Sequence, residues 1–112
     1  MQPYHDVLSL PILAAAAVKA QSCVGFDGEP AGEDEPVFGV SHFDQVAGRE
    51  VTCTVLGVMP LKATGPILKG ARVVSSATSG AKTAGATPAN PIGRALNDAA
   101  DGEQVRVLLS SR

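Results

Sequence analysis

Short apolar runs alternate with turn-forming residues along the whole 112-residue chain. The chain holds 12 glycines and 8 prolines, but only three phenylalanines, one tyrosine and no tryptophan. The alanine-rich segment at residues 14–20 is too short to form a stable helix by itself. We therefore expect an all-β fold, a small barrel or sandwich-like domain of short strands with long loops and little helix.

Strands are expected where apolar residues alternate or cluster. The clearest is residues 50–58, where Val51, Cys53 and Val55 share one face and two threonines the other. Residues 75–90 lack apolar periodicity and predict a long loop or a poorly paired hairpin. The other expected strands are residues 7–13, 22–26, 66–68, 71–74, 91–96 and 104–109. We divide the chain into an N-terminal arm, residues 1–6, and a single β-rich domain, residues 7–112.

A weak internal repeat indicates how these strands are organised. Residues 39–55 align without a gap to residues 93–109. Each copy predicts a strand, a polar turn whose aspartate bonds its own backbone, a glycine with an unusual backbone angle, and a return strand. Two such hairpin units would pack as pseudo-symmetric lobes. The structural turn residues are Gly39, Asp44 and Gly48 in the first copy and Gly93, Asp98 and Gly102 in the second.

Charge is divided unevenly along the chain, although the net charge is only −2. Residues 1–56 hold two basic and eight acidic residues, whereas residues 57–112 hold seven basic and three acidic residues. Five of the acids lie in residues 27–35, which we expect to form a loop that faces solvent or a basic patch on a neighbour. The division also suits subunits, or a protein and its partner, that meet through complementary faces. The balance is not the basic excess of a nucleic-acid coat.

The N-terminal segment and the cysteines bear on the cellular compartment. Residues 7–20 are apolar, but residues 1–6 hold Asp6 and no lysine or arginine, whereas a signal peptide opens with positive charge. We therefore expect an intracellular chain in which Cys23 and Cys53 are free, buried thiols. No apolar run approaches the length of a membrane span.

No residue pattern predicts a catalytic, cofactor or metal site. Residues 41–44, Ser-His-Phe-Asp, hold the residue types of a catalytic triad, but three neighbours in one turn cannot act on a common substrate. His42 and Cys53 could form a thiol–imidazole pair, which keeps open an enzyme whose site lies between subunits. Residues 80–83 lack the glycine cradle of a phosphate loop. We predict no enzymatic activity, no cofactor and no small-molecule substrate.

The order and spacing of the turn-plus-strand segments resemble the capsid cement (decoration) proteins of tailed bacteriophages. That family repeats a glycine, a small-residue turn and a Gly-Glu-x-Val-x-Val strand, with Gly-Ala-x-Val between the copies. The resemblance extends over roughly residues 7–112, and the chain departs from it at Gln21, where the family has glycine, and in its longer acidic loop. The segments that carry it are residues 36–40, 47–58, 67–73, 92–96 and 99–109.

The resemblance implies a β-rich homotrimer on the outer surface of the phage head, at three-fold and quasi-three-fold positions. There it would bridge major capsid protein subunits and stiffen the shell against packaged DNA, without binding nucleic acid or membrane, after synthesis in the host cytoplasm. A small intracellular β-barrel interaction module is the alternative. We hypothesise that an extended arm orders on the capsid surface, the alternative being a frayed terminus. The arm residues are Gln2, Pro3, Tyr4, His5 and Asp6.

Overall fold

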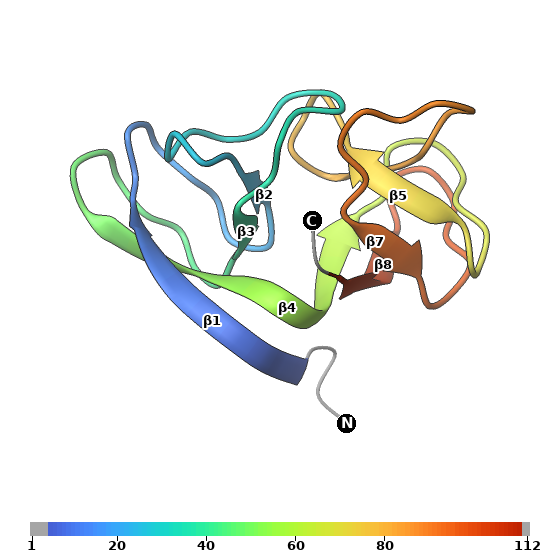
Figure 1. Ribbon diagram of the computed structural model, residues 1–112, viewed down its shortest axis with the longest axis horizontal. Helices are drawn as coiled ribbons and strands as arrows, with labels where there is room; N and C mark the ends of the chain where they lie inside the picture. Colours follow the sequence, from blue (N-terminus) through green and yellow to red (C-terminus); the bar gives the residue numbers. More distant parts are fainter. Residues whose placement is uncertain (1–4, 111–112) are drawn as a thin grey trace.

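The computed structural model describes residues 5–110, and side chains from residue 7 onward, as a curled antiparallel sheet (Figure 1). The strands follow the order β2-β3-β4-β8-β7-β5-β6, and β1 pairs with β4. No residue in the described range is helical, so the predicted all-β fold is confirmed. The strands are β1 His5–Leu13, β2 Cys23–Val24, β3 Gly39–Ser41, β4 Glu50–Lys62, β5 Arg72–Ser75, β6 Ala81–Thr83, β7 Gly93–Ala95 and β8 Gln104–Leu109.

The longest strand, β4, joins two halves of the sheet (Figure 1). Its first part pairs with β1 and β3, and its second part pairs with β8. Both β1 and β8 pair with Gly57 and Val58, so they lie along opposite edges of β4 there. Gly57 has a φ of 127°, which favours glycine, at the point where β4 changes partners. We call residues 8–55 lobe 1 and residues 57–109 lobe 2.

The repeat predicted between residues 39–55 and residues 93–109 is confirmed by the backbone pairing, and it forms the C-terminal part of each lobe. Gly48 and Gly102 have φ values of 90° and 84°, and an added Cβ would meet nothing within 4 Å. Backbone conformation, rather than packing, therefore favours glycine in both turns. The equivalent strand pairs are Ser41–Cys53 and Ala95–Val107.

The repeated aspartates bond differently from the sequence expectation. The sequence predicted that each aspartate bonds the backbone of its own turn. Instead, Asp44 and Asp98 accept hydrogen bonds from other segments. The Asp44 carboxylate accepts from the Ala20 N–H and that of Asp98 from the Lys69 N–H, both at 2.7 Å. Each aspartate thus ties its turn to the segment that leads into β2 or β5.

A second repeat, which the sequence analysis missed, completes the two lobes. Residues 8–24 and residues 57–73 occupy equivalent places. Gln21 and Gly70 are equivalent and have φ values of 56° and 86°. A positive φ favours glycine, and Gln21 adopts this left-handed backbone conformation although it has a side chain. The matching backbone bonds include Val18 with Gln45 and Ile67 with Ala99, each exchanged in both directions, and Pro11 paired with Thr52 where Pro60 pairs with Arg106.

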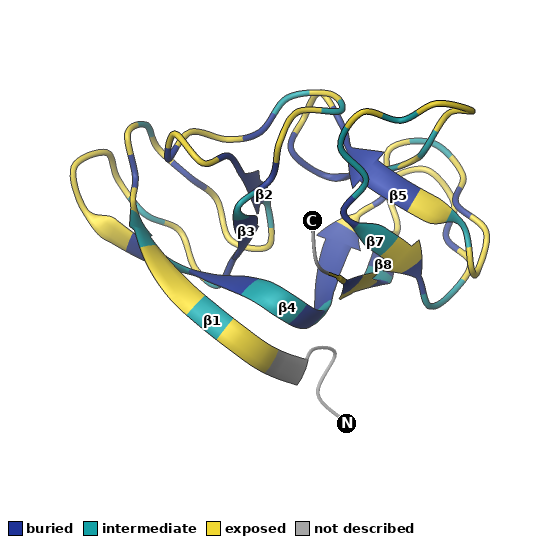
Figure 2. Cartoon of the chain, viewed as in Figure 1, coloured by how far each residue is buried: buried dark blue, intermediate teal, exposed yellow. Residues whose placement is uncertain are grey.

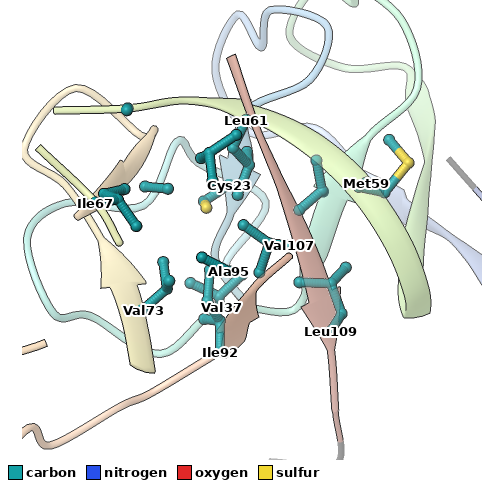
Figure 3. Packing of buried hydrophobic residues seen from close by; sticks show 14 of the residues in the cluster. Cys23, Val37, Met59, Leu61, Ile67, Val73, Ile92, Ala95, Val107 and Leu109 are labelled. Carbon is teal, nitrogen blue, oxygen red and sulfur yellow. The ribbon is translucent and has the colours of Figure 1, made fainter. Parts of the chain in front are cut away.

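Each lobe has its own hydrophobic core, and the seven apolar positions of the smaller core recur in the larger one. Figure 3 shows the packing of the larger core. The core of lobe 2 also takes Cys23, Ala31, Val37 and Val40 from lobe 1, so segments of lobe 1 help to close it. The equivalent pairs are Ile12–Leu61, Ala14–Ala63, Val18–Ile67, Val24–Val73, Phe38–Ile92, Val51–Val105 and Cys53–Val107.

The two cores differ in how well they are covered. Met59 is 1% exposed in lobe 2, whereas its equivalent in lobe 1, Leu10, is 40% exposed. Figure 2 shows the same contrast at the level of the strands, because much of β1 is exposed while the second part of β4 is largely buried. The core of lobe 1 is therefore open on a side where that of lobe 2 is closed.

Several expected elements differ in the structure. The strand expected at residues 50–58 extends to Lys62, and that expected at residues 91–96 shortens to β7. Residues 66–68 form no strand, since Ile67 makes only an isolated bridge to Ala99. The strand expected at residues 22–26 shortens to β2. Residues 75–90 contain β6, which pairs with β5 over three residues, so the alternative of a poorly paired hairpin was the better of the two predictions.

Truncating equivalent side chains tests this asymmetry. We expect Met59→Ala to lower the free energy of unfolding by about 2–5 kcal/mol, because it leaves a cavity in a closed core. Leu10→Ala should cost less than about 1 kcal/mol in the isolated protein, because water already reaches the side chain. Urea denaturation of the two variants measures both values, and equal losses would contradict the assignment of an open and a closed core.

Candidate interaction surface

Exposed large apolar side chains are concentrated on lobe 1 and the start of β1. Among the described side chains, lobe 2 exposes only Leu68 and Leu108 in this class. An uncovered apolar surface is typical of a site where another molecule binds. The exposed large apolar residues of lobe 1 and the start of β1 are Val7, Leu8, Leu10, Leu13, Phe26, Phe43 and Val46.

Four of the apolar residues at the mouth of the lobe 1 core form what we call the open face: Leu10, Ile12, Phe26 and Phe38. Leu10 lies opposite Cys53 in the ladder between β1 and β4, and Ile12 lies opposite Val51, so both point to the side of the core. Ile12 and Phe38 pack against that core. These contacts make the open face an extension of the core that residues 7–110 leave uncovered.

Phe26 is the most exposed of the four residues of the open face. Its ring stands edge-on to that of Phe38, with 5.7 Å between centroids and 81° between planes, yet Phe26 is 65% exposed. The turn that carries it is anchored to the end of β1, because the Ala15 N–H donates to the Gly28 carbonyl at 3.0 Å. Phe26 is thus held in place while most of its surface faces solvent.

The outer edge of β1 adds a second feature to this surface. Among the described strands, β1 pairs with β4 alone, so its other edge is open. An open edge presents backbone groups that can pair with a strand of another protein. Of the predicted arm, His5 and Asp6 belong to β1, where their backbones pair with Val58 and Gly57. Gln2, Pro3 and Tyr4 lie outside the described residues.

The acidic loop is partly tied to lobe 2. Glu33 forms an ion pair with Lys82 at 3.0 Å. The Asp34 carboxylate accepts the N–H groups of Ala89 and Asn90, both at 2.9 Å, and these bonds lower its pKa below the usual 3.8. Asp34 therefore orders the segment before β7. Three other acids of the loop, Asp27, Glu29 and Glu35, are exposed.

Within one chain, the structure separates the residues considered for catalysis. The His42 Nε2 atom lies 2.5 Å from the Thr54 hydroxyl, and Cys53 projects from the opposite face of β4, within the lobe 1 core. Burial raises the pKa of the Cys53 thiol to about 11, so the thiol is protonated at neutral pH. The triad reading of Ser41 also fails, because its hydroxyl donates to the Lys19 carbonyl.

The described part of the chain contains no group of three or more histidine, cysteine, aspartate or glutamate side chains that could hold a metal ion. Both Cys23 and Cys53 are buried free thiols, as predicted. None of the described segments forms a helix long and apolar enough to cross a membrane.

Comparison with known proteins gives a family match and a structural match. A family model described as phage cement protein matches residues 1–110. The solved head fiber gp8.5 N base of bacteriophage phi29 is similar with a TM-score of 0.74 and 21% identity, over 92% of this chain and 93% of that chain. At this identity the structural likeness shows a shared fold. A search of curated proteins found no match.

The lowered pKa of Asp34 predicts a pH-dependent local contact. A carboxyl whose pKa falls on folding stabilises its contact above the usual pKa, and this contribution is lost as pH falls through the lowered value. The amide proton shifts of Ala89 and Asn90 should therefore titrate below pH 3.8, as measured by NMR. The titration should vanish in Asp34→Asn and persist in the control Asp27→Asn. An unchanged titration in Asp34→Asn would contradict the contact.

Proposed function

The chain belongs to the phage cement protein family, and from this membership we propose that it is a non-enzymatic structural protein of the phage capsid. It forms a homotrimer on the outer surface of the head, at three-fold and quasi-three-fold positions. There it bridges neighbouring subunits of the major capsid protein and stabilises the shell against the pressure of packaged DNA. It needs no cofactor, and its partners are the capsid protein and its own copies.

The open face is the observation that best supports this function. Equivalent positions in lobe 2 are closed by segments of the chain, whereas Leu10 and Phe26 remain exposed in lobe 1. Burying one such side chain completely contributes about 1.5–3 kcal/mol. We propose that the major capsid protein covers the open face and pairs with the open edge of β1. A trimer makes this contact three times, so a modest affinity at each site suffices.

The arm extends the same surface. Its last two residues, His5 and Asp6, pair with β4, so residues 2–4 continue from the end of the edge strand that borders the open face. We place Gln2, Pro3 and Tyr4 against the capsid, with Tyr4 as the anchoring side chain because tyrosine suits a contact that is apolar at one end and polar at the other.

Polar substitution of two equally exposed apolar residues tests the open face. Phe26→Ser should lower occupancy on expanded, empty phage heads by ~10-fold or more, because it removes apolar area from the contact. Leu68→Ser is the matched control, since Leu68 is 70% exposed on lobe 2 and Phe26 is 65% exposed. Quantitative gel analysis of purified heads gives the occupancy, and circular dichroism checks folding. Equal occupancy of both variants would contradict the role of the open face.

Shortening the arm tests its contact separately. Deletion of residues 2–6 should reduce binding to expanded heads, but it also removes the first two residues of β1. Tyr4→Ala leaves β1 whole, so a loss of binding of ~10-fold in this variant isolates the anchoring contact. Unchanged occupancy of the deletion variant would rule out a role for the arm.

A further inference from the structure

The outer face of lobe 2 carries three arginines on neighbouring strands. Arg72 of β5 lies opposite Arg94 of β7, and Arg94 lies opposite Leu108 of β8. Arg106 lies two residues before Leu108, and the residues that alternate with them in β8 are buried in the core, so both point outward. We call Arg72, Arg94, Arg106 and Leu108 the arginine face.

The arginine face is costly for the isolated chain. Like charges directly opposite each other in a sheet destabilise it. Among the described side chains, none of the three guanidinium groups has a carboxylate within the 4.0 Å of an ion pair. The ion pair found among these side chains joins Lys82 and Glu33. Arg94 donates from Nη1 to the Gly70 carbonyl at 2.9 Å, which holds its side chain but does not neutralise it. An acidic partner would remove this cost.

The equivalent face of lobe 1 shows that this side of the sheet accepts a docked loop. Its residues Cys23, Val40 and Thr54 correspond to Arg72, Arg94 and Leu108, and all three are fully buried there. Residues 79–81 of lobe 2 lie against Cys23, whose N–H donates to the Ser79 carbonyl at 2.7 Å, and Ala81 belongs to the same core as Cys23 and Val40. On lobe 2 no described segment packs in the equivalent way, and arginines replace the buried residues.

The acidic loop of a second copy has the complementary chemistry. Asp27, Glu29 and Glu35 are exposed and have no ion pair among the described side chains. The Asp27 carboxylate accepts a hydrogen bond from the Glu29 N–H at 3.0 Å, and the Glu35 carboxylate accepts one from the Gly32 N–H at 2.6 Å. In Asp27 and Glu35, one carboxylate oxygen is therefore used to fix the side chain. The other oxygen of each is available to a guanidinium group, which forms directional bonds with carboxylates.

From this complementarity we infer that the acidic loop of one copy docks on the arginine face of the next copy. A three-fold ring joins two different surfaces head to tail, and the chain provides one in each lobe. This inference rests on the proposed homotrimer and identifies the surfaces that would form it. The contact is polar, so it determines orientation and makes assembly sensitive to salt.

Charge reversal with rescue tests the contact in the full-length protein by sedimentation velocity. We expect Arg72→Glu with Arg94→Glu, or Asp27→Lys with Glu29→Lys, to raise the concentration at which half the trimer dissociates by ~100-fold. Combining the four changes should restore assembly to within ~3-fold of the natural chain. Lys19→Glu with Arg49→Glu, two exposed basic residues of lobe 1 away from the arginine face, is the control and should assemble normally.

Two further measurements make the outcomes distinct. Arg72→Ala with Arg94→Ala should also weaken the trimer while leaving the unfolding temperature at low concentration unchanged or higher, since it relieves repulsion. If charge reversal leaves the trimer unaffected, this contact is overturned but the proposed function is not. If such an intact trimer no longer binds heads, the arginine face contacts the capsid protein instead. A natural chain that is monomeric at all concentrations and on heads overturns both.

Discussion

Strand β4 serves both lobes, and the rest of the architecture depends on this sharing. Its first part is the return strand of lobe 1, and its second part is the first strand of lobe 2, with the change of partners at Gly57. The lobes therefore share one continuous ladder of backbone hydrogen bonds. Because they are equivalent in structure but joined in series, lobe 2 packs on the outer face of lobe 1, while no described segment packs in the same way on the outer face of lobe 2. One repeated unit thus produces two different surfaces.

The C-terminal part of the repeat could be predicted from sequence because its constraints are local. Gly39 and Gly93 lie where an added Cβ would collide with a backbone oxygen of β4 or β8, and Gly48 and Gly102 have positive φ. The N-terminal part escaped detection because its constraints are weaker: Pro11 matches Pro60 and Ala14 matches Ala63, but Gln21 replaces a glycine. The loops between the two parts also differ in length, so no single alignment register covers both lobes.

The surfaces could not be predicted, because they depend on contacts between distant segments. Leu10 and Met59 are both large apolar residues in sequence, and only the folded chain distinguishes them, because Met59 is buried in the core of lobe 2 whereas Leu10 is exposed. Likewise, Arg72 and Arg94 appear dispersed along the chain until the register of β5 and β7 places them opposite each other. The sequence did predict the uneven charge, which the structure locates on a loop and a sheet face.

An apolar surface and a charged surface suit two different tasks in one small protein. An apolar contact strengthens with the area that leaves water and has little angular preference, which suits the proposed attachment to the capsid. A contact between arginines and carboxylates is directional, which suits a ring whose subunits must adopt one orientation. With orientation provided by the proposed ring, each attachment would need only a modest apolar area, because the second and third contacts of the proposed trimer would form without a further loss of translational freedom.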